Sequence, residues 1–368
     1  MKKRIESIDI LRGIAIPFIL ILTHGYWAWV AVPFPIFDPI LIRIAYFGTG
    51  IFVTFTGAST FLFINNKMKN SVRKRKILSN IFKRAIFIFT IPTCISIFYW
   101  YITSGEIIAI RFILYWNVFQ LIAVGMITFF FIPFLKIKIR IFLYFTLFFL
   151  IFLIGHLILF FNVEPLLFLT YGSEGDFPFF PYSNYILFGL FLGDFLVNLA
   201  DGKYYIYLFI FCSISIINII NWIIWLREIE YLYIESMVWS LSTLLIAFSI
   251  LYYYVDRKNH NFISKNRLLN WGRYSFSIFY VVSILIYIVE FILIIFYLKI
   301  VSRELLLFEF FIIFGICCVI IYLFTLLWER IEYKYGMEWF MRKFADFTFV
   351  KKKTADNTLL QNNLEVSK

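Results

Sequence analysis

The first apolar segment of the chain contains side chains that are costly to place in a membrane. Asp9, Arg12, Thr23 and His24 all lie within residues 8–30, which are otherwise largely apolar. An ionisable side chain inside such a segment is a functional candidate by default. Histidine exchanges protons near neutral pH, so His24 is a candidate for proton transfer. A structural role for His24 is the alternative, and the residues alone leave both open.

Asp9 and Arg12 are three positions apart, so a helix puts them on one face, where their charges can pair. On a straight helix His24 lies about 18 Å from Arg12 along the axis. This spacing would separate a guanidinium group that suits phosphate from an imidazole that suits proton transfer. The alternative for Asp9 and Arg12 is an ion pair at the membrane boundary without a chemical role.

Further polar residues occur in later apolar segments. Asn117 and Gln120 share a helix face and are candidates for a functional role, with hydrogen bonding between helices as the alternative. Arg273 precedes another apolar segment and could form a cationic phosphate site with Arg12. Its alternative is a charge that only sets membrane orientation. No role is assigned to three further ionisable residues, which are His156, Asp194 and Glu290.

The composition indicates the kind of protein that must position these residues. Hydrophobic residues make up 62% of the 368 residues and charged residues 15%, against roughly 45–50% and about 25% in soluble domains. This excludes a soluble enzyme, a disordered protein and a nucleic-acid-binding protein. The four cysteines lie in apolar runs without metal-ligand spacing, so neither a disulfide framework nor a metal site is predicted.

The apolar segments predict an all-α, polytopic integral membrane helix bundle of about ten transmembrane helices. The candidate spans lie near 8–30, 41–64, 82–102, 110–134, 141–161, 183–199, 204–226, 232–254, 274–297 and 305–328. With ten spans, the basic loops 65–84, 135–140 and 255–270 all fall on one side, which predicts cytoplasmic termini in a multi-pass cell-membrane protein. The expected domains are a transmembrane domain at 1–330, a juxtamembrane amphipathic helix at 331–348 and a disordered cytoplasmic tail at 349–368.

Several motifs resemble, in order along the chain, those of membrane acyltransferases of the heparan-α-glucosaminide N-acetyltransferase type. These are Arg4-Ile-Glu-Ser-Ile-Asp9-Ile-Leu-Arg12-Gly13, Phe52-Val-Thr-Phe-Thr-Gly57-Ala-Ser59, Asn117-Val-Phe-Gln120-Leu-Ile-Ala, Asp176-Phe-Pro178-Phe-Phe-Pro181-Tyr182 and Phe188-Gly189-Leu-Phe-Leu-Gly193. Two later stretches, Trp271-Gly272-Arg273-Tyr-Ser275 and Tyr335-Gly336-Met-Glu338-Trp339-Phe-Met-Arg342, resemble motifs of a related group of bacterial membrane proteins. The resemblance makes 1–330 an acyltransferase-like domain.

The resemblance implies transfer of an acyl group, typically acetyl, from cytoplasmic acetyl-CoA to an amine or hydroxyl of a sugar or glycoconjugate outside. By this analogy His24 is the general base or the acyl carrier, Arg12 contacts the CoA phosphates and Asp9 orients Arg12. Asn117 and Gln120 would line the site. The implied partners are the lipid bilayer, acyl-CoA and the acceptor, with no nucleic acid and no metal; a homodimer is left open.

The chain departs from the family pattern at several positions. In the related O-acyltransferases ten residues separate the helix-1 Arg from its His, whereas eleven separate Arg12 from His24 here, about 120° apart on an ideal helix. A π-bulge at Pro17 would absorb the extra residue; in the heparan type the histidine instead follows this helix. Leu121 replaces an Arg, and Tyr182 a Trp.

Two other functions compete with acyl transfer. A transporter or lipid-carrier flippase without chemistry would also contain charges inside its membrane segments. The sequence has no inverted repeat and no pair of broken helices in its favour. An integral-membrane glycosyltransferase would need an acidic cluster in an early external loop, where Asp38 stands alone.

Overall fold

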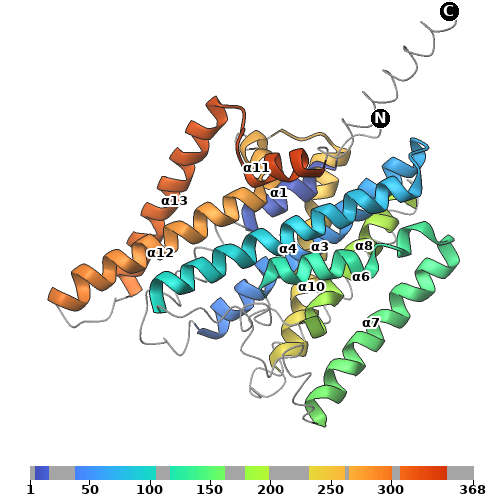
Figure 1. Cartoon of the computed structure of the whole chain (residues 1–368), viewed down its shortest axis with the longest axis horizontal. Coiled ribbons are helices and arrows are strands. Elements are labelled where there is room, and N and C mark those ends of the chain that lie inside the picture. Colours follow the sequence, from blue (N-terminus) through green and yellow to red (C-terminus); the bar gives the residue numbers. More distant parts are fainter. Residues whose placement is uncertain are drawn as a thin grey trace, which may run out of the picture. The chain divides into compact units, whose positions relative to one another are not determined.

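The computed structural model describes residues 5–15, 38–104, 117–161, 179–198, 232–261, 265–300 and 307–345 (Figure 1). Every regular element in these ranges is a helix, and none of these residues forms a strand. The predicted all-α class is therefore confirmed for the part described. The chain divides into two compact units: Met1–Leu62 with Tyr185–Tyr333, and Phe63–Asn184 with Lys334–Lys368.

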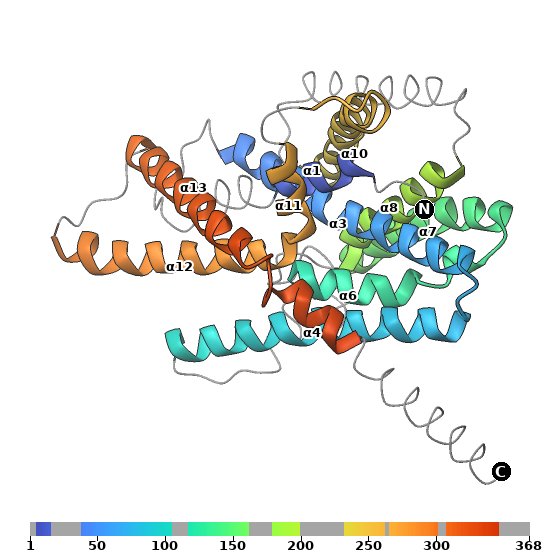
Figure 2. The same cartoon turned by 90° about the horizontal axis from the view of Figure 1, so that it is seen from above.

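The first unit contains α1, the helix on which Asp9 and Arg12 lie, and most of the other described helices. Its elements are α1 (Glu6–Ile14), most of α3 (Asp38–Lys69) and α8 (Phe179–Asn198), α10 (Leu232–Leu251), the π-helix η6 (Tyr252–Arg257), α11 (Lys265–Arg273), α12 (Ser275–Ile300) and α13 (Leu307–Arg330). α1 lies alongside α11 in both views (Figures 1 and 2).

An apolar core joins four helices of the first unit. Ile8 and Leu11 of α1 pack in one buried cluster with Phe55 of α3, Leu192 of α8 and Phe248 of α10. The rings of Phe55 and Phe248 have their centroids 5.6 Å apart. Because α1 is short, this apolar face and its contact with α11 are what hold its polar residues in place.

Small residues bring α3 and α8 into close contact. A Cβ atom at Gly57 would overlap the Ile186 carbonyl oxygen, and one at Gly189 would overlap the Thr54 carbonyl oxygen. Close backbone approach at glycines is a common way of packing helices within membranes. The Gly57 and Gly189 motifs found in the sequence therefore act in helix packing.

The second unit is built around α4 (Lys74–Ser104) and α6 (Val118–Phe129), which pack along one another (Figure 2). The short 3-10 helix η2 (Ile132–Phe134) then leads into α7 (Ile137–Phe160). α7 exposes large apolar side chains, with Phe142 67% and Phe149 69% exposed. Such a surface suits contact with lipid.

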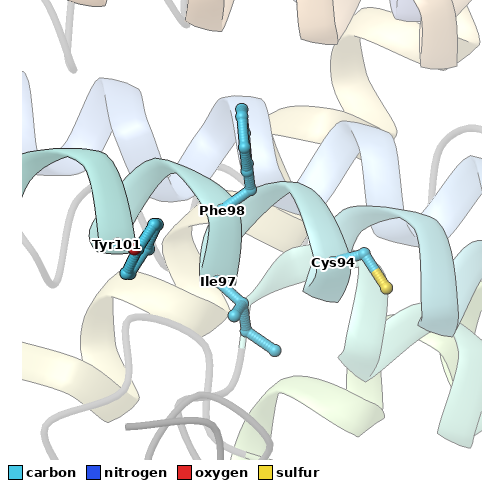
Figure 3. Close-up of a pocket in the computed structure, with 4 residues that line it drawn as sticks. All are labelled: Cys94, Ile97, Phe98 and Tyr101. Carbon is cyan, nitrogen blue, oxygen red and sulfur yellow. The ribbon is translucent and has the colours of Figure 1, made fainter. Parts of the chain in front are cut away.

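An apolar pocket lies on the surface of α4. Its lining residues, Cys94, Ile97, Phe98 and Tyr101, all come from this one helix (Figure 3). Their spacing of three, four and seven positions puts them on one helix face. The pocket is therefore an apolar surface of α4, and its four lining residues include no acid or base pair for catalysis.

Four helical stretches are long and apolar enough to cross a membrane. They are Phe47–Lys69, Lys74–Ile95, Ile137–Gly155 and Glu309–Arg330, and shorter apolar helices occupy Val118–Phe134 and Ser275–Ile286. Of the predicted spans, 204–226 lies outside the described residues, as does most of 8–30. The chain is thus a helical membrane protein, while the count of ten spans and the cytoplasmic termini stay predictions.

The region after α13 begins with a turn. Residues 331–336 are not helical, and Glu332, Tyr333 and Tyr335 have φ values of 56°, 55° and 64°. Tyr333 stacks on Tyr274, with ring centroids 4.4 Å apart. Within the predicted amphipathic helix of 331–348, residues 337–345 are helical. The predicted tail at 349–368 lies outside the described residues.

Candidate functional site

Arg12 is fixed by residues from two other helices. Its Nη2 donates a 2.7 Å hydrogen bond to Oγ of Ser275, the first residue of α12. Its guanidinium carbon also lies 5.7 Å from the ring centroid of Phe52 on α3, a cation–π distance. Arg12 as a whole is half-buried. This arrangement holds a guanidinium group ready for an anionic ligand.

Asp9 lies one turn before Arg12 on α1 and is only 3% exposed. Both residues lie on α1, in the first unit. The predicted pairing of the Asp9 carboxylate with Arg12 stays a prediction. Ser275 was not identified as a partner of Arg12 from the sequence, because the two residues are 263 positions apart.

α1 and α11 cross at two glycines. A Cβ atom at Gly272 would overlap the Asp9 carbonyl oxygen, and one at Gly13 would overlap the Leu268 carbonyl oxygen. Only residues without a side chain allow two backbones to approach this closely. The crossing positions the turn of α1 that contains Asp9 and Arg12 against α11, which leads directly into Ser275.

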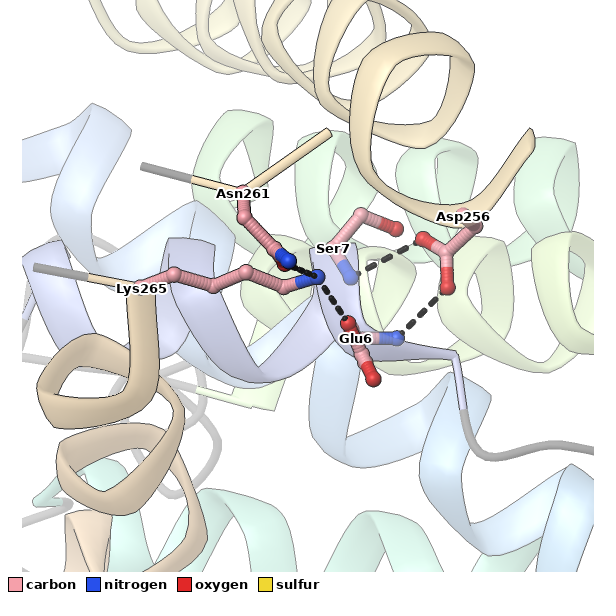
Figure 4. Close-up of polar contacts among 5 residues, drawn as sticks. All are labelled: Glu6, Ser7, Asp256, Asn261 and Lys265. Carbon is pink, nitrogen blue, oxygen red and sulfur yellow. Dashed lines mark hydrogen bonds and ion pairs between the residues drawn. The ribbon is translucent and has the colours of Figure 1, made fainter. Parts of the chain in front are cut away.

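A polar network fixes the start of α1. The carboxylate of Asp256, in η6, accepts hydrogen bonds from the backbone N–H groups of Glu6 (2.7 Å) and Ser7 (3.0 Å) (Figure 4). Lys265 Nζ pairs with Glu6 Oε2 at 2.7 Å and donates to Asn261 Oδ1 at 3.3 Å. The N-cap residue itself, Ile5, has no side chain able to cap. A carboxylate from a distant helix therefore takes over that role.

Burial determines the protonation behaviour of Asp256, which follows the predicted span 232–254. Desolvation raises the pKa of this carboxyl above its ordinary value, while the hydrogen bonds that it accepts lower the pKa in part. The nearby Glu6 carboxylate adds to the rise. Asp256 is thus a helix-capping acid in a partly desolvated environment.

Arg273 is the last residue of α11 and is exposed. It stands two positions before Ser275, the residue that binds Arg12. The structure therefore places both predicted phosphate-binding arginines in the first unit. A phosphate site shared by Arg12 and Arg273 stays a prediction.

Asn117 and Gln120 form a capping box at the start of α6, in the second unit. Asn117 Oδ1 accepts from the backbone N–H groups of Phe119 and Gln120 at 3.0 and 2.9 Å, and Gln120 Oε1 accepts from Asn117 N at 3.0 Å. Gln120 Nε2 also donates to Thr93 Oγ1 on α4 at 3.0 Å. This is the interhelical hydrogen bond given above as the alternative to a site-lining role. A contact of either residue with a substrate stays a prediction.

The remaining residues singled out in the sequence are Leu121, Asp194, His24, His156 and Glu290. Leu121, which replaces an arginine of the family pattern, is fully buried. Asp194 is buried and accepts a 2.6 Å hydrogen bond from Asn198 Nδ2. His24 lies outside the described residues, as do the side chains of His156 and Glu290. The described residues contain no group of three His, Cys, Asp or Glu able to hold a metal ion.

Comparison with known proteins gives a family. No curated protein and no solved structure matches the chain. A family model described as "Heparan-alpha-glucosaminide N-acetyltransferase, catalytic" matches residues 4–226, more than half of the chain. The matched range contains Asp9, Arg12, His24, Asn117 and Gln120, and ends before Ser275 and Asp256. The chain therefore belongs to the heparan-alpha-glucosaminide N-acetyltransferase catalytic family.

Proposed function

We propose that the protein is a membrane acetyltransferase that moves an acetyl group from cytoplasmic acetyl-CoA to an amine or hydroxyl of a sugar or glycoconjugate on the outer side. The observation that carries this proposal is the fixed guanidinium of Arg12. Arg12 lies within the family-matched segment and is held by Ser275 and Phe52. A half-buried arginine with a defined orientation suits recognition of a phosphate on the nucleotide part of CoA.

In this proposal Arg12 binds a CoA phosphate and Asp9 supports its orientation from one turn away. Arg273, exposed at the end of α11, supplies a second positive charge for the same phosphates. Both charges lie in one unit, and the α1–α11 crossing determines how α1 is oriented. The interactions of Arg12 thus bind the donor, while the bond-making step needs a different group.

His24 is the proposed group for that step. The acceptor nitrogen or oxygen attacks the acetyl carbonyl carbon, the carbon–sulfur bond breaks and CoA leaves as the thiolate. His24 takes the proton that the acceptor loses and can return it to the thiolate. In a second form of the mechanism His24 first carries the acetyl group itself. Asn117 and Gln120 are proposed to line the path of the substrates.

The experiment that tests this function measures [14C]acetyl-CoA binding and acetyl transfer by the detergent-purified full chain. Arg12→Ala should weaken binding about 10- to 100-fold, the effect of losing one charge-assisted contact. Arg12→Lys should recover part of the loss, and Arg330→Gln, which removes an exposed charge elsewhere, should bind as wild type does. His24→Ala should bind acetyl-CoA normally and lose transfer to amino sugars.

Two results would contradict the proposal. Absence of saturable acetyl-CoA binding by folded wild-type protein would favour the transporter, and substrate uptake into proteoliposomes would then be measured. Full transfer activity of His24→Ala would exclude His24 as base or acyl carrier. Free CoA and ATP serve as competitors, because binding through phosphates alone would let both displace the ligand.

A further inference from the structure

The end of the second unit at which α3 leads into α4 contains many positive charges. Seven basic residues are exposed here, including Lys74 and Lys76. We call the other five the cationic end surface: Lys69, Arg73, Arg75, Lys136 and Lys138. The segments that form this end contain no acidic residue, because Asp and Glu are absent from 39–105 and from 107–163. No carboxylate of these segments is therefore present to neutralise the five charges.

The two turns that form this surface are neighbours. The ammonium group of Lys74, the first residue of α4, lies 5.9 Å from the ring centroid of Phe134 in η2. Arg140 Nη1, on α7, donates a 3.3 Å hydrogen bond to the Pro133 carbonyl oxygen. The start of α4 and the start of α7 therefore meet at η2, and the end of α3 is joined to α4 by the short turn at 70–73.

Each of two helices continues from this surface as an exposed apolar face. On α4, Arg75 shares a face with Phe82 and Ile86, which are seven and eleven positions further on and 54% and 40% exposed. By the helix rise they lie about 10 and 16 Å from the charge. A positive charge at the start of an exposed apolar face matches the order of headgroup and acyl chain in a phospholipid.

The same order recurs on α7. Lys138 shares a face with Phe142, Phe145 and Phe149, at spacings of four, seven and eleven positions, and all three rings are exposed. Two independent helices thus place a cation at the start of an exposed apolar face. A soluble polyanion would use only the cations, whereas a phospholipid would use the cations and the apolar faces.

We propose that the cationic end surface binds the phosphate headgroup of an anionic phospholipid, whose acyl chains lie along the exposed faces of α4 and α7. This inference does not rest on the acetyltransferase proposal, because none of its residues belongs to the Arg12 site. Basic clusters next to membrane helices attract anionic lipid headgroups. Here the absence of acids in 39–105 strengthens that attraction.

The test compares lipid retention by the purified full chain in native mass spectrometry. Dioleoylphosphatidylglycerol and dioleoylphosphatidylcholine have the same acyl chains and differ in headgroup charge. Wild type should retain more phosphatidylglycerol than phosphatidylcholine. This preference, the ratio of the two retained lipids, should fall as salt rises. The variant R73Q/R75Q/K136Q/K138Q should lose at least about tenfold of that preference, since each cation contributes up to roughly fivefold.

A matched control removes the same number of charges from the first unit, as R257Q/K258Q/R267Q/R330Q. This control should keep the wild-type preference. Equal losses in both variants would show a diffuse effect of net charge and would overturn the proposal, as would equal retention of both lipids by wild type. Displacement of the lipid by inorganic phosphate or acetyl-CoA would also overturn it, because the surface would then be a soluble-anion site.

Removing four charges next to membrane helices can impair insertion. The paired variants R73Q/R75Q and K136Q/K138Q therefore test each turn separately, and size-exclusion chromatography checks that each is folded. Each pair should lower the preference by several-fold. The salt dependence of wild type needs no variant, and a preference that does not change with salt would contradict binding through charge.

Discussion

Replacing Gly272 with alanine tests whether the α1–α11 crossing positions Arg12. The new methyl group would overlap the backbone carbonyl of Asp9, and backbone atoms have no rotamer by which to avoid it. The helices would have to separate by on the order of 1–2 Å to restore ordinary contact distances. Overpacking of this kind costs about 1–3 kcal/mol, against a gain of at most about 1 kcal/mol from the better helix propensity of alanine.

The expected net loss is about 1–2 kcal/mol, seen as a fall of a few degrees in the thermal unfolding midpoint in detergent. The separation would also stretch the 2.7 Å bond between Arg12 and Ser275 beyond hydrogen-bonding distance, since Ser275 follows α11 directly. Transfer activity should then fall about 10- to 100-fold, as misplacement by about 1 Å can cause.

Gly315→Ala is the matched control, because a Cβ atom there meets no atom of the described residues within 4 Å. Gly315 also lies in a helix, α13, so the change in helix propensity is the same while the steric overlap is absent. Gly315→Ala should leave the midpoint unchanged or raise it. If Gly272→Ala behaves as Gly315→Ala does in unfolding and in acetyl-CoA binding, the crossing does not position Arg12.

Three further predictions concern hydrogen bonds. Ser275→Ala should weaken acetyl-CoA binding about tenfold by freeing Arg12 to reorient, and Ser275→Thr should restore it, as titration of ligand will show. Asn117→Ala should lower the free energy of unfolding by about 1 kcal/mol and Asn117→Ser by much less, because serine also caps a helix. If both variants instead lose substrate binding equally, Asn117 contacts the substrate. Burial raises the pKa of Asp256 above 3.8. The stability that the protonated Asp256 contributes is therefore complete below pH 3.8 and is lost as the pH rises through the raised pKa. Asp256→Asn should flatten this part of a curve of stability against pH.

Local patterns in the sequence predict much of the architecture. Long apolar segments predict the helices, and the Gly189-Leu-Phe-Leu-Gly193 spacing is typical of close helix packing, which it provides against α3. The pair Asn117 and Gln120 has the spacing of a capping box, and this signal was available from sequence alone. The family resemblance instead implies a site-lining role for the pair.

The partners that fix Arg12 and the start of α1 could not be predicted in the same way. Ser275 and Asp256 each contact residues about 250 or more positions away, and no periodicity or motif in one segment identifies its partner in the other. The Trp271-Gly272-Arg273-Tyr-Ser275 stretch resembles a known motif, but it does not identify α1 as the helix that it contacts. Its contact with α1 depends on packing that a single sequence does not encode locally.

The remote cap on α1 has a consequence for biosynthesis. Asp256 follows Glu6 by 250 residues, so its carboxylate leaves the ribosome roughly 10–50 s after α1 at ordinary rates of translation. During that interval the first backbone amides of α1 lack the acid that satisfies them in the finished fold. The final seating of the first helix must therefore be a late event, completed after α3, α4, α6, α7 and α8 have been synthesised.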